Sequence, residues 1–434
     1  MDRRLPLVFY TSCMSALRGL VAFALFLLPA FGTDRISLDE YRTRRAELRK
    51  ANGDALTILF GRTEKEHGDL RSGFFQEANF YYLTGWTEPG AILVLTPSTE
   101  VLLIPRRNAE QERWTGPKLA AEDSSTQAAT GFETVMPTEK FEANLYKWAE
   151  SGKRIYTLFD EPQVDDLKKL MPLRDFSDAK LPIARLRMKK SPGEIALIQH
   201  ATDVSIDAHR AAWLMARPGA KEFQVASVMS GLYFSAGCER HSYAPIVGSG
   251  PNGAILHYSK NTRTIDQGEL VLMDVAAECG MYGSDITRTI PANGKFTPRQ
   301  RELYDIVLGA QSAVLDAIKP GMMLGKTSPN SLNKIVVDYF NTHGKDKHGE
   351  PLGKYYTHGV SHHVGLDVHD PVDPALPLGP NMIITVEPGL YIPEEGIGIR
   401  IEDLVLITEN GGKLMTAALP RDPGEIEKIL AKRK

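Results

Sequence analysis

Two aspartates interrupt an otherwise apolar stretch of the chain, LVLMDVAAECGMYGSDITRTI, which runs from Leu270 to Ile290. A turn at Cys279-Gly280 would fold this stretch into a hairpin with Asp274 opposite Asp285. Directly opposed side chains in a hairpin lie roughly 5 Å apart, where like charges are unfavourable unless a cation lies between them. The plainer alternative is two surface aspartates on the solvent face of a hairpin, and this segment alone is consistent with both.

A second stretch, TVEPGLYIPEEGIGIRIED, repeats the pattern. Glu387 and Glu402 lie at equal distances from its Pro-Glu-Glu-Gly turn, so folding back would oppose them as well. Two hairpins that each carry a carboxylate pair inside apolar strands are hard to explain by solvation. Arg400 lies two residues from Glu402, on the same face of the strand, and is expected to hold a carboxylate in place. Its alternative role is an ordinary cross-strand ion pair.

Four of the chain's 11 histidines lie in one short segment, THGVSHHVGLDVHD, at His358, His362, His363 and His369. Histidine is the commonest metal ligand and the usual proton carrier near neutral pH. Four carboxylates with at least one imidazole suit paired ions such as Mn²⁺ or Zn²⁺ better than a thiolate site would. Two such ions can share a hydroxide and polarise a carbonyl group, which is a hydrolytic arrangement.

These blocks, together with IVGSGPNGAILHY, resemble the signature blocks of the "pita-bread" metallopeptidases, the M24 family, over residues 190–420. The segment ANFYYLTGWTEPGAILVL is similar to the creatinase-type N-domain of Xaa-Pro aminopeptidases and prolidases. The resemblance implies an α/β N-terminal creatinase-type domain followed by an α+β pita-bread catalytic domain with an antiparallel curved sheet.

The resemblance also implies a dinuclear metal site. It would hold two divalent ions, with Mn²⁺ favoured over Zn²⁺ or Co²⁺. Asp285 and Glu402 would bridge the ions, and Glu387 would also receive a proton from the metal-bound hydroxide nucleophile. The full set of implied metal ligands is Asp274, Asp285, His362, Glu387 and Glu402.

Further residues are expected to contact the substrate. By resemblance, His257 and His369 steady the tetrahedral intermediate, and both are catalytic candidates together with the proton-accepting glutamate. His358 and Arg400 are grouped with them in supporting, substrate-binding roles. His363 occupies a position that is commonly aromatic or apolar in the family, so it is interpreted as a local substitution and not as a sixth ligand.

The implied activity is hydrolysis of the Xaa-Pro bond at the N-terminus of peptides, with cleavage of Xaa-Pro dipeptides, the prolidase reaction, as the alternative. The expected partners are proline-containing peptides and, by analogy with the family, further copies of the chain in a dimer or tetramer. A zincin helix is disfavoured, although His358 and His362 have its i, i+4 spacing, because Gly359 stands where that motif needs Glu. An inert binding module and a metal-free amidinohydrolase are disfavoured by the intact ligand set.

The domain plan follows from pattern and composition. Residues 1–32 have the layout of a secretory signal peptide, with arginines before the short apolar run LVAFALFLLPAFG. An uncleaved membrane anchor and a translation start at Met14 are alternatives. The remaining plan is an N-terminal domain over 33–180, a basic linker over 181–193 and the catalytic domain over 194–434. The protein is expected to be exported, to the periplasm or the medium, without stable membrane insertion after cleavage. A net charge of −3 offers no basic surface for nucleic acid.

Several elements are expected from periodicity. Strands are predicted at ALTILFG, NFYYLTG, AILVLTP, VLLIP and RIYTLF in the first domain, and at ILHYS among others in the second. Helices are predicted near 107–121, 139–151, 162–171, 194–216, 298–318 and 330–342. Cys238 and Cys279 are the two cysteines outside the signal segment, and the sequence leaves their pairing open.

Overall fold

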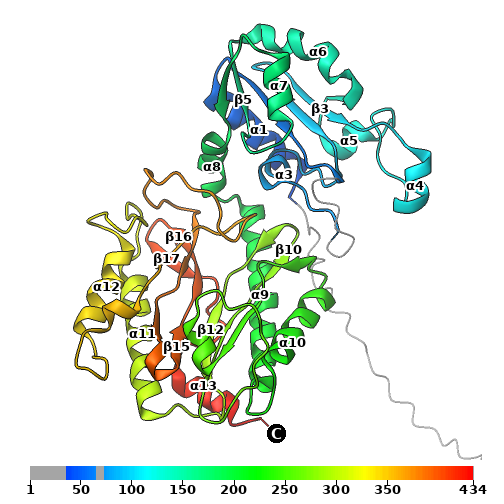
Figure 1. The fold of residues 1–434 in the computed structure, drawn as a ribbon. Helices are drawn as coiled ribbons and strands as arrows, with labels where there is room; N and C mark the ends of the chain where they lie inside the picture. Colours follow the sequence, from blue (N-terminus) through cyan, green and yellow to red (C-terminus); the bar gives the residue numbers. More distant parts are fainter. Residues whose placement is uncertain (1–35, 65–72, 434) are drawn as a thin grey trace, which may run out of the picture. The chain divides into compact units, whose positions relative to one another are not determined.

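The computed structural model describes residues 36–64 and 73–433, so the predicted signal peptide lies outside the described residues. Its N-terminal part is built on a six-stranded mixed sheet in the order β4-β3-β2-β1-β5-β6 (Figure 1). The strands are β1 (Leu56–Phe60), β2 (Ile92–Leu95), β3 (Glu100–Ile104), β4 (Thr134–Pro137), β5 (Arg154–Thr157) and β6 (Asp175–Asp178). The helices are α1 (Leu38–Asn52), α3 (Ala78–Thr84), α4 (Ala109–Thr115), α5 (Thr126–Thr130), α6 (Phe141–Trp148), α7 (Val164–Leu170) and α8 (Lys180–Met188).

Each face of this sheet is covered by an apolar cluster. On one face, side chains of β1, β3 and β5 pack against α6 and α7. On the other face, α1 and α3 join a cluster that also contains Tyr282, Val364 and Leu404 of the C-terminal part. The second cluster therefore packs the N-terminal sheet and its helices against the domain that carries the predicted site.

The segment NFYYLTG is a helix, α3, and the prediction of a strand there was wrong. Short apolar runs do not distinguish a buried strand from a buried helix, because both can be apolar on every side. The ends decide the structure here. The Glu77 carboxylate caps the first turn by accepting a hydrogen bond from the Phe80 N–H, and Gly85 ends the helix with a φ of 66°.

The segment interpreted as a linker, 181–193, is largely helical. Helix α8 occupies most of it, and α9 (Pro192–Met215) begins after a break of three residues. Ser191 and Glu194 form the predicted capping box at the start of α9, with Pro192 in the first turn. The guanidinium group of Arg44 in α1 lies 3.3 Å from the Glu194 carboxylate, so this junction is tied to both parts of the chain.

The C-terminal part is an α+β domain whose strands pair antiparallel throughout the described residues, in agreement with the predicted fold class. Its helices are α9, α10 (Glu222–Ser235), α11 (Pro298–Ala317), α12 (Leu332–Thr342) and α13 (Pro423–Leu430). Its strands are β7 (Arg240–His241), β8 (Ile246–Ser249), β9 (Leu270–Asp274), β10 (Ala277–Cys279), β11 (Tyr282–Gly283), β12 (Thr287–Pro291), β13 (Ile383–Val386), β14 (Gly389–Ile392), β15 (Ile397–Arg400), β16 (Asp403–Thr408) and β17 (Gly411–Leu414).

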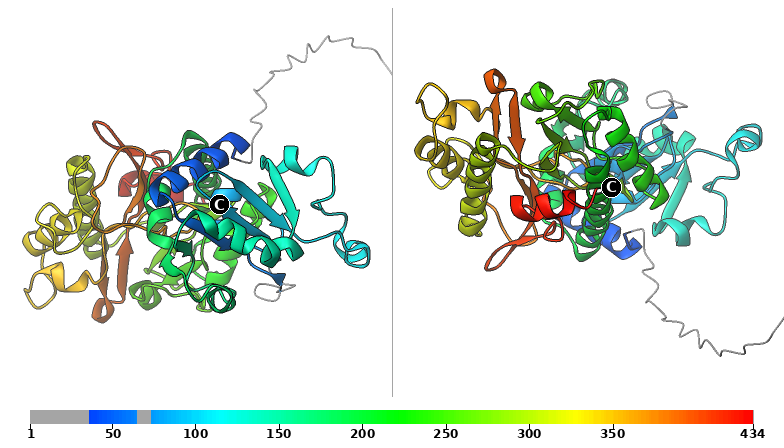
Figure 2. Two further views of the ribbon diagram at one scale, coloured as in Figure 1. Left: turned by 90° about the horizontal axis from the view of Figure 1, so that it is seen from above. Right: turned by 90° about the horizontal axis from the view of Figure 1, so that it is seen from below.

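The strands of this domain lie between two groups of helices. Figure 1 and both views of Figure 2 show β15 and its neighbours between α11 and α12 on one side and α9 and α10 on the other. One large apolar cluster joins the inner sides of both groups to the strands. Nowhere in 36–64 or 73–433 is a helix both long and apolar enough to cross a membrane.

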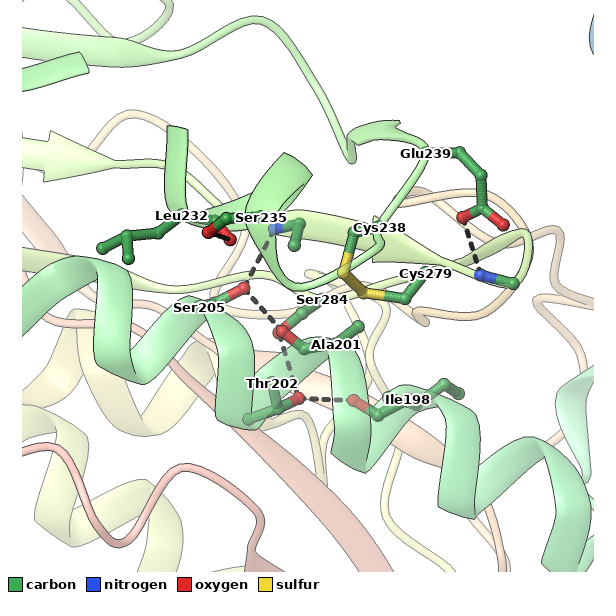
Figure 3. The surroundings of a disulfide bond; sticks show 12 residues. Ile198, Ala201, Thr202, Ser205, Leu232, Ser235, Cys238, Glu239, Cys279 and Ser284 are labelled. Atoms are coloured by element: carbon green, nitrogen blue, oxygen red, sulfur yellow. Dashed lines mark hydrogen bonds between the residues drawn. A yellow bond between two sulfur atoms is a disulfide. The ribbon is translucent and has the colours of Figure 1, made fainter. Parts of the chain in front are cut away.

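Cys238 and Cys279 form a disulfide, which the sequence left open (Figure 3). It joins Cys238, three residues beyond the end of α10, to the last residue of β10, near the tip of the first carboxylate hairpin. Two hydrogen bonds hold the same region. The Ala277 N–H donates to Ser205 of α9 at 2.9 Å, and the Gly280 N–H donates to the Glu239 carboxylate at 2.8 Å.

Candidate metal centre

The first hairpin brings its two aspartates to one face, but with a different register from the predicted one. Asp274 pairs with Thr287, and Cys279 pairs with Tyr282, so the turn lies one residue later than expected. Both turn residues, Gly280 and Met281, have positive φ angles, as a two-residue hairpin turn of this kind requires. Asp285 is therefore diagonal to Asp274 instead of opposite. Because side chains alternate along a strand, a shift of two residues leaves the carboxylate on the same face.

The second hairpin has the predicted register. Val386 pairs with Asp403 and Gly389 with Arg400, which places Glu387 opposite Glu402. The turn at Pro393–Glu395 ends at Gly396, whose φ is 63°. A β-bridge between Thr287 and Glu402 joins the two hairpins side by side. The four carboxylates consequently converge from two hairpins on one point.

His362 is placed beside these acids by a short backbone pairing with β13. The His362 N–H donates to the Thr385 hydroxyl at 3.1 Å, and the Thr385 N–H donates to the His362 carbonyl at 2.9 Å. The Nδ1 atom of His362 lies 3.0 Å from the His363 carbonyl oxygen, so Nδ1 carries the proton and Nε2 is the atom free to bind a metal. Nε2 lies 3.3 Å from an oxygen of Asp285 and 3.5 Å from an oxygen of Glu387.

The carboxylates of this site are buried, and burial disfavours their charged forms. It raises the pKa of Asp274, raises that of Glu387 to about 7 and raises that of Glu402 well above its ordinary value, although the positive charge of Arg400 opposes each shift. Burial alone would lower the pKa of His362, but the hydrogen bond and charge of Asp285 outweigh it and raise that pKa to about 9. The cluster thus has more buried negative charge than its own side chains balance.

The sequence predicted that Arg400 holds a carboxylate but did not indicate which one. Its guanidinium contacts the Asp274 carboxylate across the two hairpins, and its Nε lies 3.9 Å from Glu402. It also donates to the hydroxyls of Tyr391 at 2.8 Å and Thr287 at 3.1 Å. Arg400 therefore holds the first hairpin against the second. Its predicted contact with the substrate would be additional to these hydrogen bonds.

All nine predicted site residues line a single cavity of about 570 Å³. In this cavity the imidazole rings of His362 and His369 pack edge to face, with their ring centroids 4.3 Å apart. The Nε2 atom of His358 lies 2.8 Å from the Tyr391 hydroxyl. The cavity residues predicted from the sequence are Asp274, Asp285, His362, Glu387, Glu402, His257, His358, His369 and Arg400.

The structure also shows where His257 and His363 lie. His257 does not lie on a strand, because ILHYS follows a 3₁₀ turn (Gly250–Ala254) and continues as irregular chain. His363 is buried and does not line the cavity, in agreement with its exclusion from the ligand set.

Supporting hydroxyl groups were not found from the sequence. The Tyr243 hydroxyl donates to Asp285 at 2.6 Å, and the Thr287 hydroxyl donates to Glu402 at 2.6 Å. The Thr385 hydroxyl likewise donates to the Glu387 carboxylate at 3.3 Å. Thr287 and Thr385 lie two residues from predicted ligands, on the same strand face, and this spacing could have indicated them. No comparable signal marks Tyr243.

Comparison with known proteins shows which family the chain belongs to. Residues 196–409 match the family model described as metallopeptidase family M24, and residues 41–156 match that of the aminopeptidase P N-terminal domain. The Xaa-Pro aminopeptidase of Haemophilus influenzae is 33% identical over 430 residues, which cover 91% of this chain and 98% of the relative. The chain belongs to metallopeptidase family M24. It is accordingly a hydrolase.

Solved structures agree with this membership. Escherichia coli aminopeptidase P with the inhibitor Pro-Leu has a TM-score of 0.80 at 31% identity, and the zinc-substituted enzyme with product has 0.81 at 31%. Each match covers 92% of this chain and 99% of the other. The M24 fold with its aminopeptidase P N-terminal domain is thus present over nearly the full length of these proteins.

The residues of the site fit the divalent metal that the family name implies. The donors are hard carboxylate oxygens and one imidazole nitrogen, and Asp285, His362 and Glu402 offer ligand atoms within 4.8 Å of one another. One oxygen of Asp274, Oδ1, is buried and has no hydrogen-bond partner. A buried carboxylate oxygen without a partner is costly unless a cation binds it.

Proposed function

We propose that the protein is an Xaa-Pro aminopeptidase that releases the first residue of peptides whose second residue is proline. The observation that carries this proposal is the convergence of five metal-ligating side chains on one cavity. The similarity to the Xaa-Pro aminopeptidase of H. influenzae and to the aminopeptidase P of E. coli supports the same reaction. A bond to proline is a tertiary amide without an N–H, so recognition rests on ring shape and apolar contact. The cavity offers such a surface at Ile246, Leu256 and Val368.

The proposed site binds two divalent ions, with Mn²⁺ as the preferred metal. Two carboxylate pairs, one diagonal and one directly opposed, together with a single imidazole support two ions better than one. When bound, the ions would activate water for attack and polarise the scissile carbonyl group. The ligands would be Asp274, Asp285, His362, Glu387 and Glu402, with Asp285 and Glu402 shared between the ions.

The protein's own groups would move the protons and hold the substrate. Glu387, whose pKa is raised to about 7 by burial, can accept a proton from the attacking water near neutral pH. His369 is kept neutral because burial lowers its pKa, so it can donate a hydrogen bond to a developing oxyanion without bringing a charge. His257 stands in the same cavity and would make the second such contact.

The deciding experiment compares rates on an Xaa-Pro dipeptide and an Xaa-Pro-Yaa-Zaa tetrapeptide, using the purified protein loaded with Mn²⁺. We expect the higher kcat/KM on the tetrapeptide. Preference for the dipeptide would assign the prolidase reaction instead. A metal-loaded protein that cleaves neither peptide would be an inert member of the family.

We propose further that the protein is exported and that residues 1–32 are removed. Besides the signal-like layout of that segment, the disulfide between Cys238 and Cys279 supports export, because disulfides persist in oxidising compartments. N-terminal sequencing of the protein from fractionated cells tests this. Mature protein beginning near residue 33 outside the cytoplasm is expected, and a cytoplasmic protein with residues 1–32 retained would contradict it.

A further inference from the structure

Glu222, the first residue of α10, is completely buried, and its carboxylate accepts five hydrogen bonds. One oxygen receives the Ser249 N–H at 2.8 Å, the Ser249 hydroxyl at 2.8 Å and the Asn252 amide at 3.1 Å. The other receives the Tyr258 hydroxyl at 2.7 Å and the Arg263 N–H at 2.9 Å. Both oxygens of a buried carboxylate are thus committed to the chain that surrounds it.

The five donors are spread along residues 249–263, which carry His257. This segment begins at Ser249, the last residue of β8, and ends before β9; beyond Ser249 it contains a 3₁₀ turn but no strand. Leu256, His257 and Ser259 from it line the cavity, whereas Glu222 does not. Ordering irregular backbone costs conformational entropy at every residue, so such a segment needs compensating bonds. Hydrogen bonds to a charged carboxylate are the strongest available for that purpose.

The two halves of the segment are held differently. The first half packs closely on β15, where a side chain added at Gly398 would lie 1.8 Å from the Gly253 carbonyl oxygen. The second half contains Tyr258, which directly follows His257 and whose hydroxyl donates a hydrogen bond to Glu222. The Tyr258 ring also packs against Ile246 and Leu272, so removing its hydroxyl loosens the part of the segment that presents the imidazole without removing this packing. Removing the Ser249 hydroxyl leaves the packed half in place.

We propose that Glu222 is a positioning residue for His257, acting through Tyr258 to hold the imidazole in the cavity. This inference rests on the substrate contact of His257 in the proposed function. Glu222 would not touch the substrate or the ions. Its loss would therefore lower kcat/KM without changing the metal content.

Three variants of the metal-loaded enzyme test the proposal. Glu222→Gln converts one acceptor oxygen into a donor, and Tyr258→Phe removes one hydroxyl from the side of His257. Ser249→Ala is the matched control, because it removes one hydroxyl from the other oxygen. We expect kcat/KM to fall about tenfold in the first two and less than about twofold in the control, at unchanged metal content. Equal effects of Tyr258→Phe and Ser249→Ala would overturn the proposal.

A double-mutant cycle separates positioning from a general structural role. In a His257→Ala background, Tyr258→Phe should cause no further loss, because the group it positions is already absent. If Tyr258 had only a general structural role, the reductions in kcat/KM caused by the two substitutions would multiply in the double variant. Amide hydrogen exchange in residues 250–260 should also rise in Tyr258→Phe, and unchanged exchange there would contradict the inference even if Glu222→Gln fails to fold.

The same data distinguish this proposal from the proposed function. Full activity of His257→Ala would remove His257 from the reaction and overturn the positioning role with it. The peptidase assignment would stand in that case, because turnover of the tetrapeptide by the parent enzyme measures it separately.

Discussion

The Nε2 atom of His362 lies 3.3 Å from a carboxylate oxygen of Asp285, while Nδ1 of the same ring lies 3.0 Å from the His363 carbonyl oxygen. The carbonyl orients the ring, so Nε2 is directed at the acids. In the metal-free protein a proton on Nε2 partly balances the buried carboxylates. A metal ion at this point would displace that proton and take over its role.

Metal binding is therefore expected to stabilise the protein more at higher pH. The pKa of His362 is raised to about 9, so its stabilising contribution is complete below its ordinary value of 6.5 and is lost as the pH rises through about 9. The pKa of Glu387 is raised to about 7, so its contribution to the stability of the metal-free protein is lost as the pH rises from 4.5 to about 7. The gain in Tm on adding Mn²⁺ should accordingly be larger near pH 8 than near pH 6. A gain that is equal or smaller at the higher pH would contradict this, and thermal melts with and without metal measure it.

Replacing Asp285 by Asn should abolish metal binding and turnover while the protein stays folded. The Asp285 carboxylate contacts both His362 and the Tyr243 hydroxyl, and it is one of the proposed bridging ligands. We expect kcat to fall by more than about 100-fold, with metal content lost by elemental analysis and an unchanged circular dichroism spectrum. Asp305→Asn on α11, an exposed carboxylate paired with Arg301, is the control and should keep both metal and activity. Undiminished turnover in Asp285→Asn would exclude the dinuclear mechanism.

That the carboxylates of each hairpin share a face could be predicted from the sequence, because strand alternation fixes which side chains point the same way. At the first hairpin the predicted turn was one residue too early, yet Asp285 still faces the cavity, since the resulting shift in pairing is an even number of residues. The second hairpin needed no correction, because Gly396 marks its turn. Fold class followed from the same alternation and from the family resemblance.

What could not be predicted depends on contacts between distant segments. Arg400 was expected to hold a carboxylate, but the sequence does not show that its guanidinium reaches Asp274 on the other hairpin. The helix α3 was taken for a strand, because a short run buried on all sides has no periodicity to reveal. Glu222 lies 35 residues from the residue it is proposed to position, and no local pattern in the sequence connects the two.

Removing the disulfide should lower stability but leave activity in the folded protein. Cys238 and Cys279 are separated by 41 residues, and a crosslink over that length is worth about 4 kcal/mol at most by the chain-entropy model. The double variant Cys238→Ser/Cys279→Ser should therefore melt several degrees lower, with kcat/KM at about 25 °C within about twofold of the parent. Loss of activity without loss of Tm would show instead that the disulfide acts on the site itself.

Asp370 follows His369 directly and anchors the histidine segment to α8. Its carboxylate, 1% exposed, accepts hydrogen bonds from the Arg187 guanidinium at 2.6 Å and the Lys190 ammonium at 3.0 Å. Burial alone would raise the pKa of Asp370, but these two cations outweigh it and lower the pKa to about 2. Arg187 also donates to Asn79 of α3 at 2.8 Å, so the network spans both domains.

Replacing Asp370 by Asn should destabilise the protein near neutral pH, because it leaves Lys190 buried without its carboxylate and Arg187 with only the half-exposed Asp367, at a cost of about 3 kcal/mol. The stabilising contribution of the wild-type carboxylate, about 2 kcal/mol, is present above its unfolded pKa of about 3.9 and is lost as the pH falls through about 2. The difference in Tm between the parent and Asp370→Asn should therefore be largest above about pH 4 and shrink as the pH falls below it. Thermal melts of both proteins across this range measure the difference, with Asp305→Asn as the control that should differ little from the parent at any pH. A gap between Asp370→Asn and the parent that stays constant down to the lowest pH would show that the Asp370 side chain stabilises the protein by its shape and not by its charge.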